Sequence, residues 1–115
     1  MPRQGEVFWV DEGEPVGSEP GYRRPYVVIQ NDRWNESPIR TVLVMAMTTN
    51  LRRARVPGNV LVTAADTGLS LDSVIVVSQV STLDRDELTE IAGVVPRAAV
   101  RQAIAGLNLV LAPVR

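Results

Sequence analysis

Short segments rich in valine and isoleucine follow one another along most of this chain without an intervening helix, and this pattern constrains its fold most strongly. Each segment has the length and composition of a β-strand. Residues that favour turns separate the segments, among them Asn31-Asp32, Pro57-Gly58 and Thr67-Gly68. Five or six strands at this spacing predict a small antiparallel barrel or sandwich. The expected strands are Gly5–Asp11, Tyr26–Gln30, Thr41–Met47, Asn59–Thr63, Ser73–Gln79 and Ile91–Val95.

The pattern changes after Pro96, which we expect in the first turn of a helix. From there apolar residues recur at spacings of three and four, which predicts a C-terminal helix that ends near Pro113. Gly106 lies inside this helix and weakens it by roughly 1 kcal/mol relative to alanine. With 115 residues, the chain is expected to form one domain, residues 1–115. The apolar stripe of the helix consists of Val100, Ala103, Ile104, Leu107, Val110 and Leu111.

Three residue types are absent, and their absence excludes most classes of enzyme. The chain has no cysteine and no histidine, and all 12 of its basic residues are arginine. Thiolate zinc sites, cysteine nucleophiles, Ser-His-Asp triads, histidine–metal clusters and lysine Schiff bases are therefore excluded. We expect no metal and no cofactor, so catalysis must come from arginine, carboxylates, hydroxyl groups or the backbone.

A net charge of −1 hides a strong asymmetry along the chain. Residues 1–20 carry a net charge of −4, residues 21–55 a net charge of +5 and residues 56–115 a net charge of −2. An arginine cluster in a nearly neutral chain favours a local anion site, and guanidinium groups bind phosphate in a fork geometry. The alternative is solvated surface charge. The arginines of the basic segment are Arg23, Arg24, Arg33, Arg40, Arg52, Arg53 and Arg55.

The sequence shows no targeting signal. It begins Met-Pro-Arg-Gln-Gly-Glu, without a basic stretch followed by an apolar one. Its longest apolar run is far shorter than the ~18 residues of a membrane-spanning helix. We therefore expect a cytoplasmic protein that has no membrane partner.

Three blocks of residues, in order and at matching spacing over nearly the whole chain, carry a resemblance to a known family. The first block is Gly17-Ser18-Glu19, followed by Arg23-Arg24-Pro25 and Val27–Asp32. The second block is Thr48-Thr49-Asn50 with Arg55–Val60. The third block runs from Asp72-Ser73 through Ser78-Gln79-Val80 to Thr82-Leu83-Asp84. The expected helix from Pro96 to Ala112 follows them. In these features the chain resembles the MazF/PemK family of toxin endoribonucleases.

The resemblance implies a mainly β fold: a small SH3-like barrel of five to seven short strands, of the CcdB/MazF toxin type, with a C-terminal α-helix. It also implies a homodimer that cuts single-stranded RNA, chiefly messenger RNA, at short sequences without a metal. Such a toxin belongs to a type II toxin–antitoxin system, inhibits translation and growth, and is silenced by a cognate antitoxin. The family's catalytic arginine and threonine correspond to Arg24 and Thr48.

The residues are consistent with this chemistry, because RNA carries its own nucleophile in the 2′-hydroxyl. An enzyme without histidine or metal can still position that attack and stabilise charge on the phosphate oxygens. Arg24 offers permanently charged planar donors, Thr48 offers a hydroxyl donor, and Glu19 is the nearest carboxylate that could take the 2′-OH proton. The structural alternatives are a surface salt bridge between Arg24 and the acidic loop, and a Thr48 side chain that satisfies a turn.

Further residues are candidates for RNA binding, each with a structural alternative. Ser18 either bonds a phosphate or holds its loop, and Trp34 either stacks on a base or forms a lid over the core. Ser78 and Gln79, at the expected end of a strand, either read base edges or form a buried pair at the end of the ladder. The arginines between the third and fourth strands either follow the RNA backbone or are solvated. The candidates are Ser18, Arg23, Trp34, Arg52, Arg53, Arg55, Ser78 and Gln79.

Two other classes of function are weighed against the nuclease. A gyrase-binding toxin, CcdB, shares the fold but acts through a C-terminal Trp-Gly-Ile ending, whereas this chain ends Ala112-Pro113-Val114-Arg115. A non-catalytic SH3-like module would bind RNA without cutting it. For the nuclease, we expect an antitoxin with an acidic, partly disordered segment that blocks the arginine cluster. We also expect the helix stripe to contribute to a homodimer interface, because one small sheet would not cover it completely.

Overall fold

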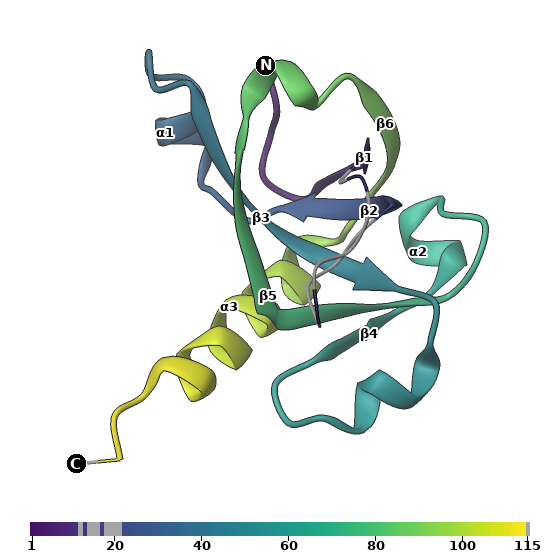
Figure 1. Cartoon of the computed structure of the whole chain (residues 1–115). Coiled ribbons are helices and arrows are strands. Elements are labelled where there is room, and N and C mark those ends of the chain that lie inside the picture. The colour runs from purple at the N-terminus through teal and green to yellow at the C-terminus, as the bar shows by residue number, and fades with distance from the viewer. Residues whose placement is uncertain (12, 14–16, 18–21, 115) are drawn as a thin grey trace.

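A computed structural model describes residues 1–11, 13, 17 and 22–114 of the chain. Six strands come first, with short helices between them, and one long helix follows (Figure 1). The strands are β1 (Glu6–Asp11), β2 (Arg23–Val28), β3 (Thr41–Thr48), β4 (Val60–Val62), β5 (Ser73–Asp84) and β6 (Glu90–Val94). The helices are α1 (Asp32–Asn35), η1 (Leu51–Arg55), α2 (Ala64–Thr67), η2 (Arg85–Glu87) and α3 (Arg97–Leu111), where η denotes a 3-10 turn.

All six strands form one antiparallel sheet in the order β4-β5-β3-β2-β1-β6. The sheet curls into a half-barrel (Figure 1), and α2 approaches the edge strand β6 so closely that a Cβ on Gly93 would lie 2.5 Å from the Thr67 carbonyl oxygen. The predicted mainly β fold of five to seven short strands with a C-terminal helix is confirmed, with six strands in the residues that the structure describes.

Both faces of the curled sheet are buried, which is why its strands carry consecutive apolar residues instead of a strict alternation. On one face Val7, Val27 and Met45 pack with Val100 and Ala103 of α3. The opposite face forms a second cluster, built from Phe8, Val10, Tyr26, Val28, Val42, Val44, Ala46, Leu83 and Leu88. Two opposed cores hold the sheet between them and fix the register of its central strands.

Helix α3 packs on β4 and β5, and a glycine lets it approach the chain just before β4. A Cβ on Gly106 would lie 2.1 Å from the carbonyl oxygen of Gly58, whose own φ of +94° suits glycine. The glycine that weakens the helix is therefore needed for this contact. Beyond it the helix projects past the sheet (Figure 1), and its apolar stripe is only partly covered, because Ile104, Val110 and Leu111 are exposed. No helix in the described part of the chain is both long and apolar enough to cross a membrane.

Three details differ from the sequence expectation. Strand β2 begins at Arg23 instead of Tyr26, and β5 continues to Asp84 instead of ending at Gln79. The longer β5 contains a change of register, since Ile75 pairs with Met47 whereas Val80 pairs with Met45. Four short helical turns lie between the strands in the described part of the chain, where no helix was expected. Each begins at a side chain that accepts a backbone N–H: Asn31, Asn50, Thr63 and Asp84.

Candidate functional site

Arg24 and Thr48 lie at neighbouring strand ends. Strand β2 begins at Arg23 and β3 ends at Thr48, and the two strands pair Tyr26 with Ala46 in antiparallel register. Continuing that register by two residues places Arg24 across from Thr48. The Arg24 side chain also reaches from β2 to β3, since its Nη2 donates a hydrogen bond to the carbonyl oxygen of Met47 at 3.3 Å. The structure therefore brings the predicted catalytic pair together at one end of the sheet.

The second core cluster supports this pair. Arg24 pairs with Val10 of β1, and alternation along β2 puts Arg24 on the same face as Tyr26 and Val28, which are buried in that cluster. Arg24 itself is half-buried, and among the described residues it has no ion-pair partner. The structural alternative for Arg24 was a salt bridge with the acidic loop, and Glu12, Glu14 and Glu19 of that loop lie outside the described residues.

The Thr48 hydroxyl accepts a hydrogen bond from the backbone N–H of Asn50 at 3.2 Å. This is the turn role that was the structural alternative for Thr48, but it occupies only a lone pair and leaves the hydroxyl hydrogen available to donate. The side chain of Asn50 in turn accepts from the Arg52 N–H and begins η1. A few consecutive residues thus connect the end of β3 to the turn that carries the arginines.

The arginines of η1 form a locally positive surface. Arg52 and Arg55 are exposed and Arg53 is half-buried, and none of the three has an ion-pair partner in the part of the chain that the structure describes. Residues 49–65 contain no carboxylate. An anionic ligand would therefore meet these arginines without displacing an ion pair inside the described chain.

Ser78 and Gln79 were expected to end a strand, and that expectation is wrong. Both lie inside β5, in the stretch where the register with β3 changes between Ile75 and Val80. Ser78 is exposed and so is not half of a buried pair. The Oε1 atom of Gln79 is buried and has no hydrogen-bond partner among the residues that the structure describes. The change of register leaves this stretch of β5, opposite Ala46 of β3, outside the regular ladder.

Two of the predicted RNA-binding residues lie elsewhere. Arg23 forms an ion pair with Glu90 and stands over the ring of Trp9, 5.1 Å from its centroid, so its charge is already engaged on another surface. Trp34 lies on α1, is 57 % exposed and is not a lid over the core. It lines an open cavity of about 480 Å³ together with Thr41, which starts β3 at the opposite end from Thr48. Ser18 and Glu19 lie outside the described residues.

Polar residues that the sequence analysis did not single out hold the loops. Arg85 donates from Nη2 to the carbonyl oxygen of Asn35 at 2.8 Å, and Asn59 bonds both η1 and β5. Asp32 starts α1 and accepts the backbone N–H of Gln4 at 2.8 Å, and this bond is the largest of the influences that lower the pKa of its carboxyl group. The sequence signal for Asn59 was its place directly after Pro57-Gly58, a polar residue between a tight turn and a strand.

A known protein family and several curated proteins match most of this chain. The family model described as "PemK-like, MazF-like toxin of type II toxin-antitoxin system" matches residues 3–111. Endoribonuclease MazF6 of Mycobacterium tuberculosis H37Rv is 41% identical over 108 residues, which cover 94% of this chain and 95% of that protein. Endoribonuclease EndoA of Bacillus subtilis is 40% identical over 89 residues, covering 76% of this chain and 75% of that protein.

Solved structures share the fold. An endoribonuclease in complex with its cognate antitoxin, from a mycobacterial species, has a TM-score of 0.78 at 23% identity and covers 100% of both chains. MazF from Deinococcus radiodurans has a TM-score of 0.78 at 21% identity, with 97% of each chain covered. At this level of identity these likenesses establish the architecture, while the curated relatives establish the family.

Proposed function

Since this chain belongs to the PemK-like, MazF-like family and is an endoribonuclease toxin of a toxin–antitoxin system, we propose that it cuts single-stranded messenger RNA by attack of a 2′-hydroxyl on the adjacent phosphate. The observation that carries this mechanism is the placement of Arg24 beside Thr48, with the guanidinium held by the Met47 carbonyl oxygen at 3.3 Å. A fixed cation and a hydroxyl donor at one strand end are suited to bind a phosphate as its charge grows.

In the proposed reaction the 2′-oxygen forms a bond to phosphorus and the bond from phosphorus to the 5′-oxygen breaks. The products are a 2′,3′-cyclic phosphate and a free 5′-hydroxyl. Arg24 stabilises the charge that develops on the non-bridging oxygens, and Thr48 donates a hydrogen bond to one of them. Glu19 is the proposed acceptor of the 2′-OH proton, and the leaving 5′-oxygen takes a proton from water.

Binding of the RNA chain is assigned to two segments beside this pair. Arg52, Arg53 and Arg55 of η1 follow the backbone, which is supported by their freedom from ion pairs within the described residues. Ser78 and Gln79 contact base edges, and the support is the exposed position of Ser78 in the irregular stretch of β5. Gln79 would turn its buried Oε1 atom outward to reach a base. Arg23 and Trp34 stay candidates for RNA contact on two other surfaces, Arg23 beside Glu90 and Trp9, and Trp34 at the cavity near the start of β3.

The proposed partners are a second copy of the chain and a cognate antitoxin. The toxin acts in the cytoplasm, where messenger RNA is translated, and its cleavage of messenger RNA inhibits translation and growth. The antitoxin carries an acidic segment that competes with RNA for the η1 arginines, so replacing Arg52, Arg53 and Arg55 by alanine should weaken both ligands. Undiminished antitoxin binding by this triple variant, with no displacement of RNA, would show that the antitoxin binds elsewhere.

The test is incubation of the full chain with a long RNA of mixed sequence in EDTA, followed by mapping of the new 5′ ends. We expect discrete cuts at a short recurring sequence, 5′-hydroxyl ends, and no change on adding EDTA. Intact RNA that nevertheless binds the protein would indicate a non-catalytic module. Cuts with 5′-phosphate ends, or cuts that EDTA abolishes, would exclude the proposed chemistry.

A further inference from the structure

The side chain of Asn59 connects the two segments to which RNA binding is assigned. Its Nδ2 donates to the carbonyl oxygen of Arg53 in η1 at 3.0 Å. Its Oδ1 accepts the backbone N–H of Val77 in β5, also at 3.0 Å. Val77 is the residue before Ser78 and Gln79, within the irregular stretch of β5. One carboxamide therefore bridges the arginine turn and the segment that carries Ser78 and Gln79.

The position of Asn59 is itself set from two sides. Its backbone N–H donates to the carbonyl oxygen of Val56 at 3.1 Å and closes the turn after η1. Gly58 is held against Gly106 of α3, and a Cβ on Gly58 would lie 3.2 Å from the Gly106 Cα and 3.3 Å from the Val77 side chain. The turn before Asn59 thus fills the space between α3 and β5, and it can move little without moving one of them.

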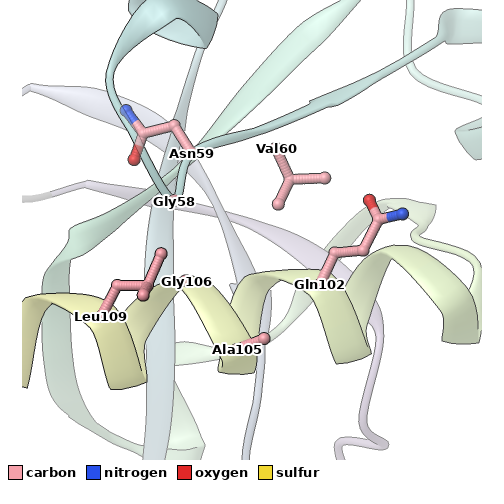
Figure 2. A pocket seen from close by; sticks show the side chains of 7 residues that line it. All are labelled: Gly58, Asn59, Val60, Gln102, Ala105, Gly106 and Leu109. Carbon is pink, nitrogen blue, oxygen red and sulfur yellow. The ribbon is translucent and has the colours of Figure 1, made fainter. Parts of the chain in front are cut away.

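The surroundings indicate that Asn59 acts through its neighbours. It lines an open groove of about 370 Å³ between this turn and α3, where Gln102, Ala105 and Leu109 form the other wall (Figure 2). In that view its carboxamide lies apart from the carboxamide of Gln102. Both of its polar groups are engaged within the protein, so its contribution to ligand binding would come from the two segments it joins.

We propose that Asn59 is a positioning residue for RNA binding, which holds the η1 arginines and the Ser78–Gln79 segment at a fixed separation; this rests on the proposed function. A single-stranded RNA that contacts both segments binds best when their spacing is already fixed in the free protein, because binding then loses less conformational entropy. Loss of the bridge should weaken RNA binding and leave the rate of the bound complex nearly unchanged, because Arg24 and Thr48 are held by β2 and β3.

The variant Asn59→Leu tests this, because it removes both hydrogen bonds, keeps the size of the side chain and adds no charge. Gln102→Ala is the matched control from the opposite wall of the groove. Binding is measured by fluorescence anisotropy with a labelled RNA that spans a mapped cleavage site and carries deoxyribose 5′ to the cut. The cleavage rate is measured on the all-ribose RNA at saturating protein.

We expect Kd for Asn59→Leu to rise about five- to tenfold, as for the loss of one or two net hydrogen bonds, with the saturated rate within about twofold of wild type. Gln102→Ala should match wild type in both. Wild-type affinity of Asn59→Leu, or a rate that falls while Kd stays unchanged, would overturn the proposal. If the wild-type chain cuts RNA, the proposed function stands whichever result Asn59→Leu gives. If it neither binds nor cuts RNA, both proposals fail.

Should Asn59→Leu fail to fold, hydrogen exchange on the wild-type chain decides instead. In the free chain the backbone amides of residues 51–56 and 77–79 should exchange with one shared opening free energy, since the bridge couples them, and the uncleavable RNA should slow exchange of both. Protection of only one of these segments, or of neither, would overturn the proposal.

Discussion

At the scale of single residues, the account depends on Arg24 and Thr48. Arg24→Ala removes the main stabiliser of phosphate charge, so the cleavage rate should fall by about 10²–10³, the typical effect of removing one such donor. Thr48→Ala should cost a similar or smaller factor, because it removes one neutral hydrogen bond. Since both groups act on one transition state, the double variant should lose less than the product of the single losses. Single-turnover cleavage of a labelled RNA measures all four proteins, and full activity of Arg24→Ala would refute the assignment.

A second prediction at this scale concerns Asp32, which joins the N-terminal segment to α1. Its Oδ1 accepts the Gln4 N–H and its Oδ2 lies 3.4 Å from the Arg3 guanidinium. These contacts lower the pKa of the Asp32 carboxyl group in the folded protein. Their contribution to stability is therefore fully present above the pKa of the unfolded chain, about 3.9. It is lost as the pH falls through the lower pKa of the folded protein.

The variant Asp32→Asn keeps an acceptor and removes the charge. We expect it to be less stable than wild type at pH 7 by about 1 kcal/mol or less, because the carboxylate is partly exposed. The gap should close as the pH falls below the folded pKa. Urea unfolding at several pH values measures it, and a gap that widens toward acid would contradict the sign of the shift.

At the scale of elements, the contact between α3 and the turn before β4 gives an unusual expectation for a helix glycine. On propensity alone Gly106→Ala should stabilise the helix by about 1 kcal/mol. A Cβ there would lie 2.1 Å from the Gly58 carbonyl oxygen, so backbone must move and we expect a net destabilisation of about 1–3 kcal/mol. Denaturant unfolding measures it, with Ala105→Gly as the control for propensity. A more stable Gly106→Ala variant would show that the two segments are not held together.

The same elements show what the sequence could and could not predict. The strands and α3 were predictable because periodicity and turn residues are local signals. The extension of β5 to Asp84 and its change of register were not, because they depend on pairing with β3 residues that lie 26 to 43 positions away in the chain. Gly106 is needed because it packs against Gly58, and Arg23 is engaged because it pairs with Glu90. No local sequence pattern reveals either contact. Family motifs predict Arg24 and Thr48 as the catalytic pair. The place of Asn59 after Pro57-Gly58 marks it as a polar residue at a turn, but its link between η1 and β5 is visible only from its contacts with Arg53 and Val77.

At the scale of the whole molecule, the face of the sheet that α3 covers leaves apolar side chains exposed. Leu111 of α3 is 66 % exposed and Leu43 of β3 is 42 % exposed. Leu43 and Val80 share the face of Met45, which packs beneath α3. Val100 is buried in the monomer and Leu107 is partly buried, so they contribute less to a dimer than the expected stripe suggested.

We predict a homodimer that uses this surface, with a mass about twice 12.6 kDa. Replacing Leu43 and Leu111 together by glutamate should shift the equilibrium toward monomer, because two charges would be buried without partners. Light scattering after gel filtration, at micromolar protein and physiological salt, measures both proteins. A strictly monomeric wild type would contradict the prediction.

The central claim is that RNA supplies the nucleophile and that the protein stabilises the phosphate. The most direct measurement uses two RNA oligonucleotides that span a mapped cleavage site and differ only in the ribose 5′ to the cut. With ribose there, we predict cleavage in EDTA to a 2′,3′-cyclic phosphate and a 5′-hydroxyl. With deoxyribose, cleavage should cease while binding falls much less. Cleavage of the deoxyribose substrate at a comparable rate would contradict the mechanism.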